Sequence, residues 1–205
     1  MNLRIILTLL LLAVVASGVV PAAEQELSGS LGLRGGGEMR QRDVGGTTRS
    51  LDASAAISID YGRRLRSDTW FTAFWSHQQT EFDSAGAFSD DGSFDLDIDY
   101  LHAGGTYRPG RDGRAEGFVT VTMGLTWYRP DRAGFGDEYG FSLSAGGGTQ
   151  IPLSPRCDLR LTARGYVTFT SARFGGQCAS GGCTFSFTGE GAFQLEGLVG
   201  IVFRL

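Results

Sequence analysis

The chain has 205 residues, with 18 basic and 22 acidic side chains and a formal net charge of −4 at pH 7. All 18 basic residues are arginine and they are scattered, which argues against nucleic acid as a partner, because its recognition needs clustered positive charge. The 32 glycines, 14 phenylalanines and only 5 prolines suit many strands joined by turns rather than a helical bundle.

The first residues predict export from the cytoplasm. Arg4 precedes an apolar run over residues 5–15, and small residues follow near Ala22, which is the pattern of a secretory signal peptide. We expect the signal peptide to cover residues 1–22, with cleavage after Ala22 or one residue later. The run is short for an uncleaved anchor helix, which needs about 20 apolar residues. Residues 23–205 then form one domain.

The first half of this domain contains four segments in which apolar and polar residues alternate. Residues 26–35 alternate leucine with serine and arginine, and residues 51–61 have one clearly apolar face. Residues 69–77 are apolar on both faces, so their register stays open. In residues 94–105 the apolar row alternates with three aspartates, which we expect to face the interior of the fold.

The second half contains four more such segments, residues 118–128, 140–151, 158–169 and 193–205. In each one, large apolar side chains alternate with serine, threonine, glycine or arginine. The connections between the eight segments alternate between short turns and long loops. An even number of antiparallel strands joined in this way is typical of outer-membrane barrels, whose short turns face the periplasm. The sequence therefore predicts an all-β fold, an eight-stranded antiparallel transmembrane up-and-down β-barrel.

The composition of the polar rows indicates whether lipid or water surrounds this barrel. A water-soluble barrel also alternates, but with its apolar row inward. Its outer row would carry many long charged side chains, whereas the polar row here is rich in Ser, Thr, Gly and Ala. Small residues suit the narrow lumen of an eight-stranded barrel. We therefore expect the apolar rows to face lipid.

Three stretches carry a resemblance to a known family. They read DLDIDYLHAGGTY, GFSLSAGGGTQIPLSPRCDLRLTARGY and, at the end, LVGIVFRL. Together they resemble the small outer-membrane β-barrels related to the OmpA transmembrane domain, OmpX and OmpW. The resemblance implies a monomer in the bacterial outer membrane, in contact with its lipid and lipopolysaccharide. It also implies that the barrel-assembly machinery reads a C-terminal insertion signal, which here is Val199, Ile201, Phe203 and Leu205, although the family usually ends in Phe.

Charged residues on the expected lumen side are the first candidate site. They are Asp95, Asp97, Asp99, Arg160, Arg164, Glu196 and Arg204. Unpaired charges in a narrow interior are costly, so we expect them to pair with one another. The pairs could form a gated constriction or a permanent plug, and we favour the plug. The three aspartates lack the glycine bend and final glutamate of a calcium loop, so we expect neither a metal nor a cofactor.

The three cysteines fall into two groups. Cys178 and Cys183 lie close together in the longest outer loop and are expected to form a disulfide in an oxidising compartment. Cys157 lies at a periplasmic turn, across an apolar band of roughly 25 Å, and should stay unpaired.

An enzyme is the rival class, since some barrels of this membrane modify lipids. The only histidines are His77 and His102. Ser76 adjoins His77, but neighbours in a strand point to opposite faces, and His102 falls on the expected lipid-facing row. We therefore expect no catalytic residues. The expected function is structural, or binding and adhesion through the outer loops; the alternative is a small channel for modest or hydrophobic solutes.

Overall fold

The computed structural model describes ten segments of the chain. They are residues 24–36, 38–40, 48–50, 53–83, 93–110, 115–131, 136–169, 177–179, 182–184 and 192–205. The expected signal peptide, residues 1–22, lies outside them. Within these segments, no helix is long and apolar enough to cross a membrane.

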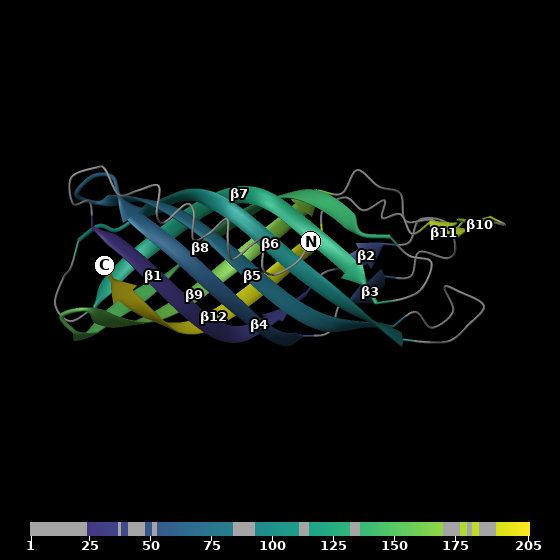
Figure 1. Cartoon of the computed structure of the whole chain (residues 1–205), viewed down its shortest axis with the longest axis horizontal. Coiled ribbons are helices and arrows are strands. Elements are labelled where there is room, and N and C mark those ends of the chain that lie inside the picture. The colour runs from purple at the N-terminus through teal and green to yellow at the C-terminus, as the bar shows by residue number, and fades with distance from the viewer. Residues whose placement is uncertain are drawn as a thin grey trace.

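Eight long strands close into one barrel (Figure 1). They are β1 (Gln25–Gly35), β4 (Ser54–Arg64), β5 (Thr69–Asp83), β6 (Ser93–Tyr107), β7 (Glu116–Pro130), β8 (Glu138–Ser154), β9 (Cys157–Phe169) and β12 (Ala192–Arg204). Each pairs antiparallel with the next along the chain, and β12 returns to pair with β1. The predicted all-β, eight-stranded antiparallel barrel is confirmed.

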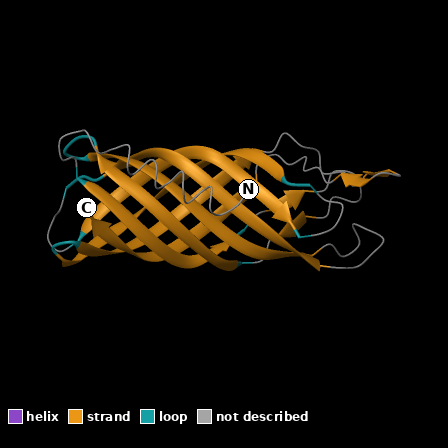
Figure 2. Ribbon diagram, in the orientation of Figure 1, coloured by secondary structure: helices purple, strands orange, loops and turns teal. Residues whose placement is uncertain are grey.

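Two short hairpins lie beyond one end of the barrel. They are formed by β2 (Glu38–Arg40) with β3 (Thr48–Ser50), and by β10 (Gln177–Ala179) with β11 (Gly182–Thr184). The short turns lie at the opposite end, beside the C-terminus (Figure 2). In barrels of the outer-membrane type that end faces the periplasm. The alternation of short turns and long loops is thus as the sequence predicts.

The seam between β1 and β12 closes the sheet. Ten register pairs join the two strands, from Glu26 opposite Arg204 to Gly35 opposite Leu195. Every barrel strand therefore has two hydrogen-bonded neighbours. A spanning β-structure requires this, because hydrocarbon offers no partner to a free backbone group.

The outer wall of the barrel is apolar. Leu31, Val121 and Leu195 are 65%, 66% and 58% exposed. Leaving a large apolar side chain in water forgoes about 1.5–3 kcal/mol compared with burying it, and such residues recur around the whole wall. Most of the buried side chains inside are instead polar or charged, chiefly serine, threonine, glutamine and arginine, beside a smaller group of apolar and aromatic residues. The alternative of a water-soluble barrel with an oily core is therefore wrong.

Strand β6 is turned the opposite way to the prediction. Leu96, Ile98 and Tyr100 are buried inside the barrel, whereas the run of Asp95, Asp97 and Asp99 lies on the outer wall. The error has a physical cause. β6 continues beyond the apolar belt, and above that belt the outer wall no longer needs to be apolar. Tyr100, which belongs to the apolar row expected to face lipid, is an interior residue for the same reason.

The register of β5, which the sequence left open, is fixed by its pairing with β4 and β6. Trp70 and Phe74 face the interior and are buried, while Trp75 and His77 lie on the outer face. Aromatic side chains thus lie on both faces of β5. For this reason the alternation of apolar and polar residues could not predict which face points inward.

Candidate functional site: the barrel interior

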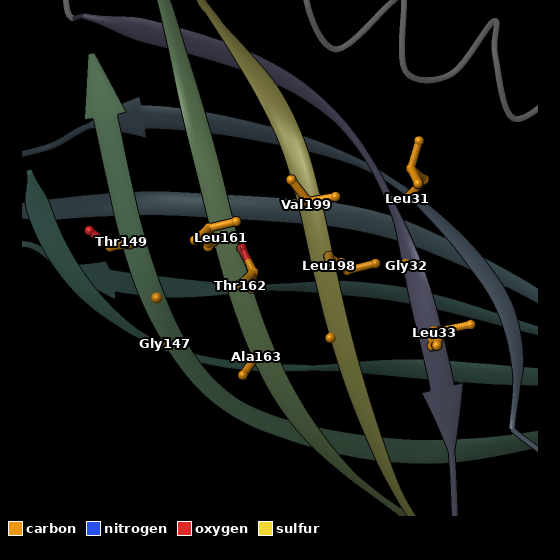
Figure 3. A pocket seen from close by; sticks show the side chains of 12 residues that line it. Leu31, Gly32, Leu33, Gly147, Thr149, Leu161, Thr162, Ala163, Leu198 and Val199 are labelled. Atoms are coloured by element: carbon orange, nitrogen blue, oxygen red, sulfur yellow. The ribbon is translucent and has the colours of Figure 1, made fainter. Parts of the chain in front are cut away.

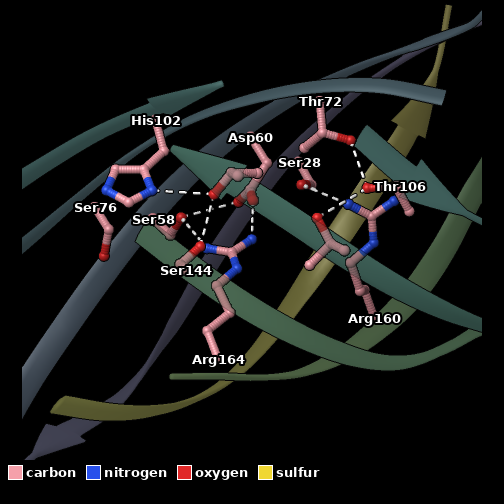
Figure 4. Close-up of polar contacts among 12 residues, drawn as sticks. Ser28, Ser58, Asp60, Thr72, Ser76, His102, Thr106, Ser144, Arg160 and Arg164 are labelled. Carbon is pink, nitrogen blue, oxygen red and sulfur yellow. Dashed lines mark hydrogen bonds and ion pairs between the residues drawn. The ribbon is translucent and has the colours of Figure 1, made fainter. Parts of the chain in front are cut away.

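Arg164 extends into the barrel interior toward Ser58 and Asp60, where it forms the centre of a charged group (Figure 4). Its Nη2 donates to Asp60 Oδ1, its Nη1 donates to Ser58 Oγ at 3.3 Å, and the same Nη1 is 3.6 Å from Glu196 Oε1. The guanidinium carbon stands 4.1 Å from the centre of the Phe74 ring. Both side chains of the Arg164–Asp60 pair are at least 95% buried.

Glu196 joins this centre to a second layer nearer the long loops. Arg34 donates to Glu196 Oε2 from Nη2 at 2.5 Å and from Nε at 2.8 Å. Ser76 Oγ donates to the same oxygen at 2.9 Å, and Tyr166 Oη donates to Oε1 at 3.0 Å. A fully buried carboxylate with this many donors is compensated for the loss of water.

A third layer lies near the periplasmic end. Glu26 accepts hydrogen bonds from Arg108 and Arg160, and Arg160 Nη2 also donates to Gln150 Oε1 at 2.8 Å. In the same region Arg204 Nη2 donates to Asp158 Oδ2 at 2.5 Å. The charged pairs thus extend over three levels of the lumen.

Among the described residues, the buried charges that face the lumen balance, and the remaining buried acid, Asp99, lies on the outer face. Four acids, Glu26, Asp60, Asp158 and Glu196, face four arginines, Arg34, Arg108, Arg160 and Arg164. Arg204 adds a fifth cation at the rim, where its side chain is about one-third exposed. Arginine suits such pairs because its planar guanidinium donates several hydrogen bonds from fixed positions.

An apolar and aromatic cluster fills the half of the lumen nearer the long loops. It consists of Phe74, Leu96, Ile98, Tyr100, Tyr128 and Tyr166, all buried. Tyr100 and Tyr166 stack at 4.2 Å between ring centres, and Tyr100 Oη donates to Gln194 Oε1 at 2.6 Å. Ion pairs and aromatic rings together occupy the cross-section of the barrel.

His102 faces the interior and not the lipid, which corrects the prediction. Its Nε2 lies 2.7 Å from Ser142 Oγ and its Nδ1 lies 3.0 Å from Thr122 Oγ1. The ring stacks on Phe74 at 5.1 Å. The correction follows from β6, because His102 shares the face of Leu96, Ile98 and Tyr100.

The predicted charge network is partly brought together. The structure places Arg160, Arg164 and Glu196 inside the lumen and Arg204 at its periplasmic rim, but the aspartates of β6 outside it. Interior members that the prediction missed are Glu26, Arg34, Asp60, Arg108 and Asp158. Arg34 and Asp60 already stood in polar rows of the sequence, so their strand position was a usable signal. In the described segments, no group of three or more His, Cys, Asp or Glu could hold a metal ion.

Several solved structures share this fold, although their sequences differ greatly from this one. Neisserial surface protein A is 13% identical, with a TM-score of 0.61 over 90% of this chain and 98% of that chain. The outer membrane protein OprG from Pseudomonas aeruginosa is 12% identical, with a TM-score of 0.55 over 90% and 96%. The outer membrane protein AlkL, solved in lipid bilayers, is 12% identical, with a TM-score of 0.53 over 89% and 90%.

The fold is that of the small outer-membrane β-barrels. No protein-family model matches the chain, and no curated protein matches its sequence.

The wall of this outer-membrane barrel carries a groove of about 690 Å³ over β8, β9, β12 and β1 (Figure 3). Gly147, Ala163 and Gly197 are neighbours in register on its floor, and Leu31 and Leu161 stand beside them. The strands beneath it pair without a gap. The groove is therefore a surface for hydrocarbon and not an entrance to the lumen.

The last strand of the outer-membrane barrel presents its apolar row to the outside. Val199, Phe203 and Leu205 are exposed, Ile201 is half-buried, and all four lie on the outer face. The residues of the expected insertion signal are thus accessible from the membrane side, and their reading by the assembly machinery stays a prediction.

The cysteines lie at opposite ends of the barrel. Cys178 and Cys183 stand directly opposite each other in the β10–β11 hairpin, and Cys157 begins β9 at the periplasmic end as a free cysteine. The disulfide between Cys178 and Cys183 stays a prediction.

Proposed function

We propose that this outer-membrane barrel is a structural protein of the cell envelope whose lumen is permanently plugged. Its interactions with other molecules are then made from the outer wall and the extracellular loops. The observation that carries the proposal is the filled cross-section at Arg34, Glu196 and the Tyr100–Tyr166 stack, where all four side chains are buried.

The energetics support a plug over a gate. Removing one partner of a buried ion pair costs about 3–5 kcal/mol, because the other charge is left without compensation. Glu196 is held by three further elements, through Arg34 of β1, Ser76 of β5 and Tyr166 of β9. Opening a path here would break several such bonds at once, without an alternative partner for each group.

Single-channel recording in planar bilayers tests the plug. The purified protein should give no steady openings above the baseline of the lipid alone. Steady openings that Arg164→Ala alters would support the alternative, a small channel for modest or hydrophobic solutes. Heat-modifiable migration on a gel should accompany each recording, so that an unfolded barrel is not mistaken for a closed one.

We also propose that the protein is not an enzyme. In the part of the chain that the structure describes, Ser142 and His102 lie at the distance of a nucleophile and its base, and both side chains are buried within the plug. Covalent catalysis needs such a pair within reach of a substrate. Ser76 and His77 point to opposite faces of β5. Hydrolysis of lipid A by the purified protein, lost in His77→Ala, would contradict this proposal.

The proposed partners follow from the same architecture. Outer-membrane lipid and lipopolysaccharide surround the apolar wall, and the barrel-assembly machinery reads the outer row of β12 during insertion. The seam between β1 and β12 closes within one chain, which favours a monomer.

A further inference from the structure

The outer wall of β5, β6 and β7 carries a polar cluster that the plug does not use. We define the rim cluster as Trp75, His77, Asp99, Trp127 and Arg129. Asp99 is its centre. Trp75 Nε1 donates to Asp99 Oδ1 at 2.9 Å, His77 Nδ1 lies 3.0 Å from the same oxygen, and Arg129 Nη2 donates to Oδ2 at 2.5 Å.

The rim cluster lies where the apolar belt ends on the side of the long loops. His77, Asp99 and Trp127 are neighbours in register across three strands. The outward residues one step toward the periplasm include Leu101 and Leu125, which are both more than half exposed. One step the other way lies Asp97. Tryptophan favours such boundaries, because its ring is apolar and its N–H is polar. The cluster therefore stands at the height of the outer-leaflet headgroups.

Three groups of the rim cluster and its surroundings remain open to a ligand. His77 turns Nδ1 to Asp99, so Nε2 lies on the far side of a ring that is 28% exposed. The side chains of Arg129 and Asp97 are each 34% exposed and stand 3.7 Å apart. The guanidinium of Arg129 also lies 5.6 Å from the centre of the Trp127 ring. Donors, acceptors and an aromatic ring are thus held side by side.

Charge selects the chemistry of the ligand. Among the described residues of this region, the outward carboxylates Asp95, Asp97 and Asp99 outnumber the one arginine, Arg129, so the local field is negative when His77 is neutral. Like charges repel, and a phosphate is therefore disfavoured. Sugar hydroxyl groups both donate and accept hydrogen bonds without charge, and the C–H face of a sugar ring can pack on an indole.

We infer that the rim cluster binds the sugar headgroup of an outer-leaflet glycolipid. His77 Nε2 and Asp97 accept hydrogen bonds from sugar hydroxyl groups, Arg129 donates to them, and Trp127 packs against the sugar ring. Asp99 is a positioning residue that orients His77 and Arg129. The inference rests on the proposed function only in that the barrel lies in the outer membrane; it does not depend on whether the lumen conducts.

The three tryptophans allow a direct test in the whole protein. Trp75 and Trp127 belong to the rim cluster, whereas Trp70 faces the lumen beneath Arg108, 4.0 Å from ring centre to guanidinium. The ¹⁵N-labelled barrel in phosphatidylcholine nanodiscs would be titrated with a neutral, phosphate-free hexose oligosaccharide. The indole N–H signals of Trp75 and Trp127 should shift saturably, and that of Trp70 should not move.

Variants assign the effect to individual side chains. His77→Ala and Arg129→Ala should each raise the dissociation constant by about tenfold or more, because each variant loses a hydrogen bond to the ligand. Arg66→Ala, in the exposed periplasmic turn, should leave it unchanged. Inorganic phosphate should produce no saturable shift at the same sites.

Two results would overturn the inference. One is the absence of a saturable shift in the unmodified protein, which decides the matter even if a variant fails to fold. The other is an equal response to inorganic phosphate, which would identify an anion site instead. Steady conductance would refute the proposed plug but would say nothing against the sugar site. A failure of the plug and a failure of the sugar site can therefore be told apart.

Discussion

Arg164 on β9 donates a hydrogen bond to Asp60 on β4, 104 residues away in the sequence. The two strands are not neighbours in the sheet, since β12 and β1 lie between them. The bond therefore crosses the lumen and forms only when the seam between β1 and β12 has closed. Closure of the sheet and formation of this ion pair are in this way coupled.

Replacing Arg164 tests how much the plug stabilises the barrel. Arg164→Ala leaves Asp60 and part of Glu196 without a cation, and we expect a loss of about 3–5 kcal/mol in the free energy of unfolding. Urea unfolding in lipid vesicles measures it.

Arg64→Ala is the matched control, because the Arg64–Glu24 pair is exposed at the periplasmic rim. Exposed pairs contribute about 0–1 kcal/mol. Equal losses in the two variants would contradict the central role of the buried pair.

Two glycines on opposite faces of the wall should respond differently to a methyl group. A Cβ at Gly148 would lie 1.9 Å from the Leu161 carbonyl oxygen, whereas at Gly197 no atom lies within 4 Å. Gly148→Ala should lower the free energy of unfolding by at least about 1–3 kcal/mol, as overpacking does. Gly197→Ala should be neutral or slightly stabilising, since glycine weakens a strand interior. If both variants lowered the free energy of unfolding by the same amount, a Cβ at Gly197 would have to contact a neighbouring atom, contrary to the structure.

The stack of Tyr100 on Tyr166 should be part of what closes the lumen. The double variant Tyr100→Ala, Tyr166→Ala removes two buried rings from one cross-section, and water should enter the space. We expect brief conductance events in planar bilayers that the unmodified protein lacks. If the double variant shows no conductance events, the ion pairs alone are enough to close the lumen.

The corrected orientation of β6 can be checked on whole cells. In a background with the three native cysteines replaced by serine, Asp97→Cys should react with a membrane-impermeant maleimide, because Asp97 faces outward above the apolar belt. Ile98→Cys should not, because Ile98 is fully buried inside. The reverse pattern would restore the orientation first expected from the sequence.

Mass mapping of the oxidised protein should show a bridge between Cys178 and Cys183. Their backbones are paired across the β10–β11 hairpin, and closing so short a loop should stabilise by about 2–3 kcal/mol. Cys157 should carry the alkylating reagent. A bridge that includes Cys157 would be incompatible with its place at the other end of the barrel.

The sequence by itself determined the number of strands, their antiparallel order and which end carries the short turns. In β1, β4, β7, β8, β9 and β12 it also determined the inner and outer faces. In those strands the outer face meets hydrocarbon over most of its length. Lipid favours apolar side chains there, so the local alternation of apolar and polar residues is enough to identify the outer face.

Only the tertiary structure decided the orientation of β6, the place of His102 and the partners of the buried charges. Alternation distinguishes two faces without saying which is inside, and Asp99 and Leu101 share one face of β6 because the membrane ends between them. The pairing of Arg164 with Asp60 depends on how far each strand is displaced along its neighbours around the closed ring. That displacement is a property of the whole sheet, and no single segment of the sequence contains it.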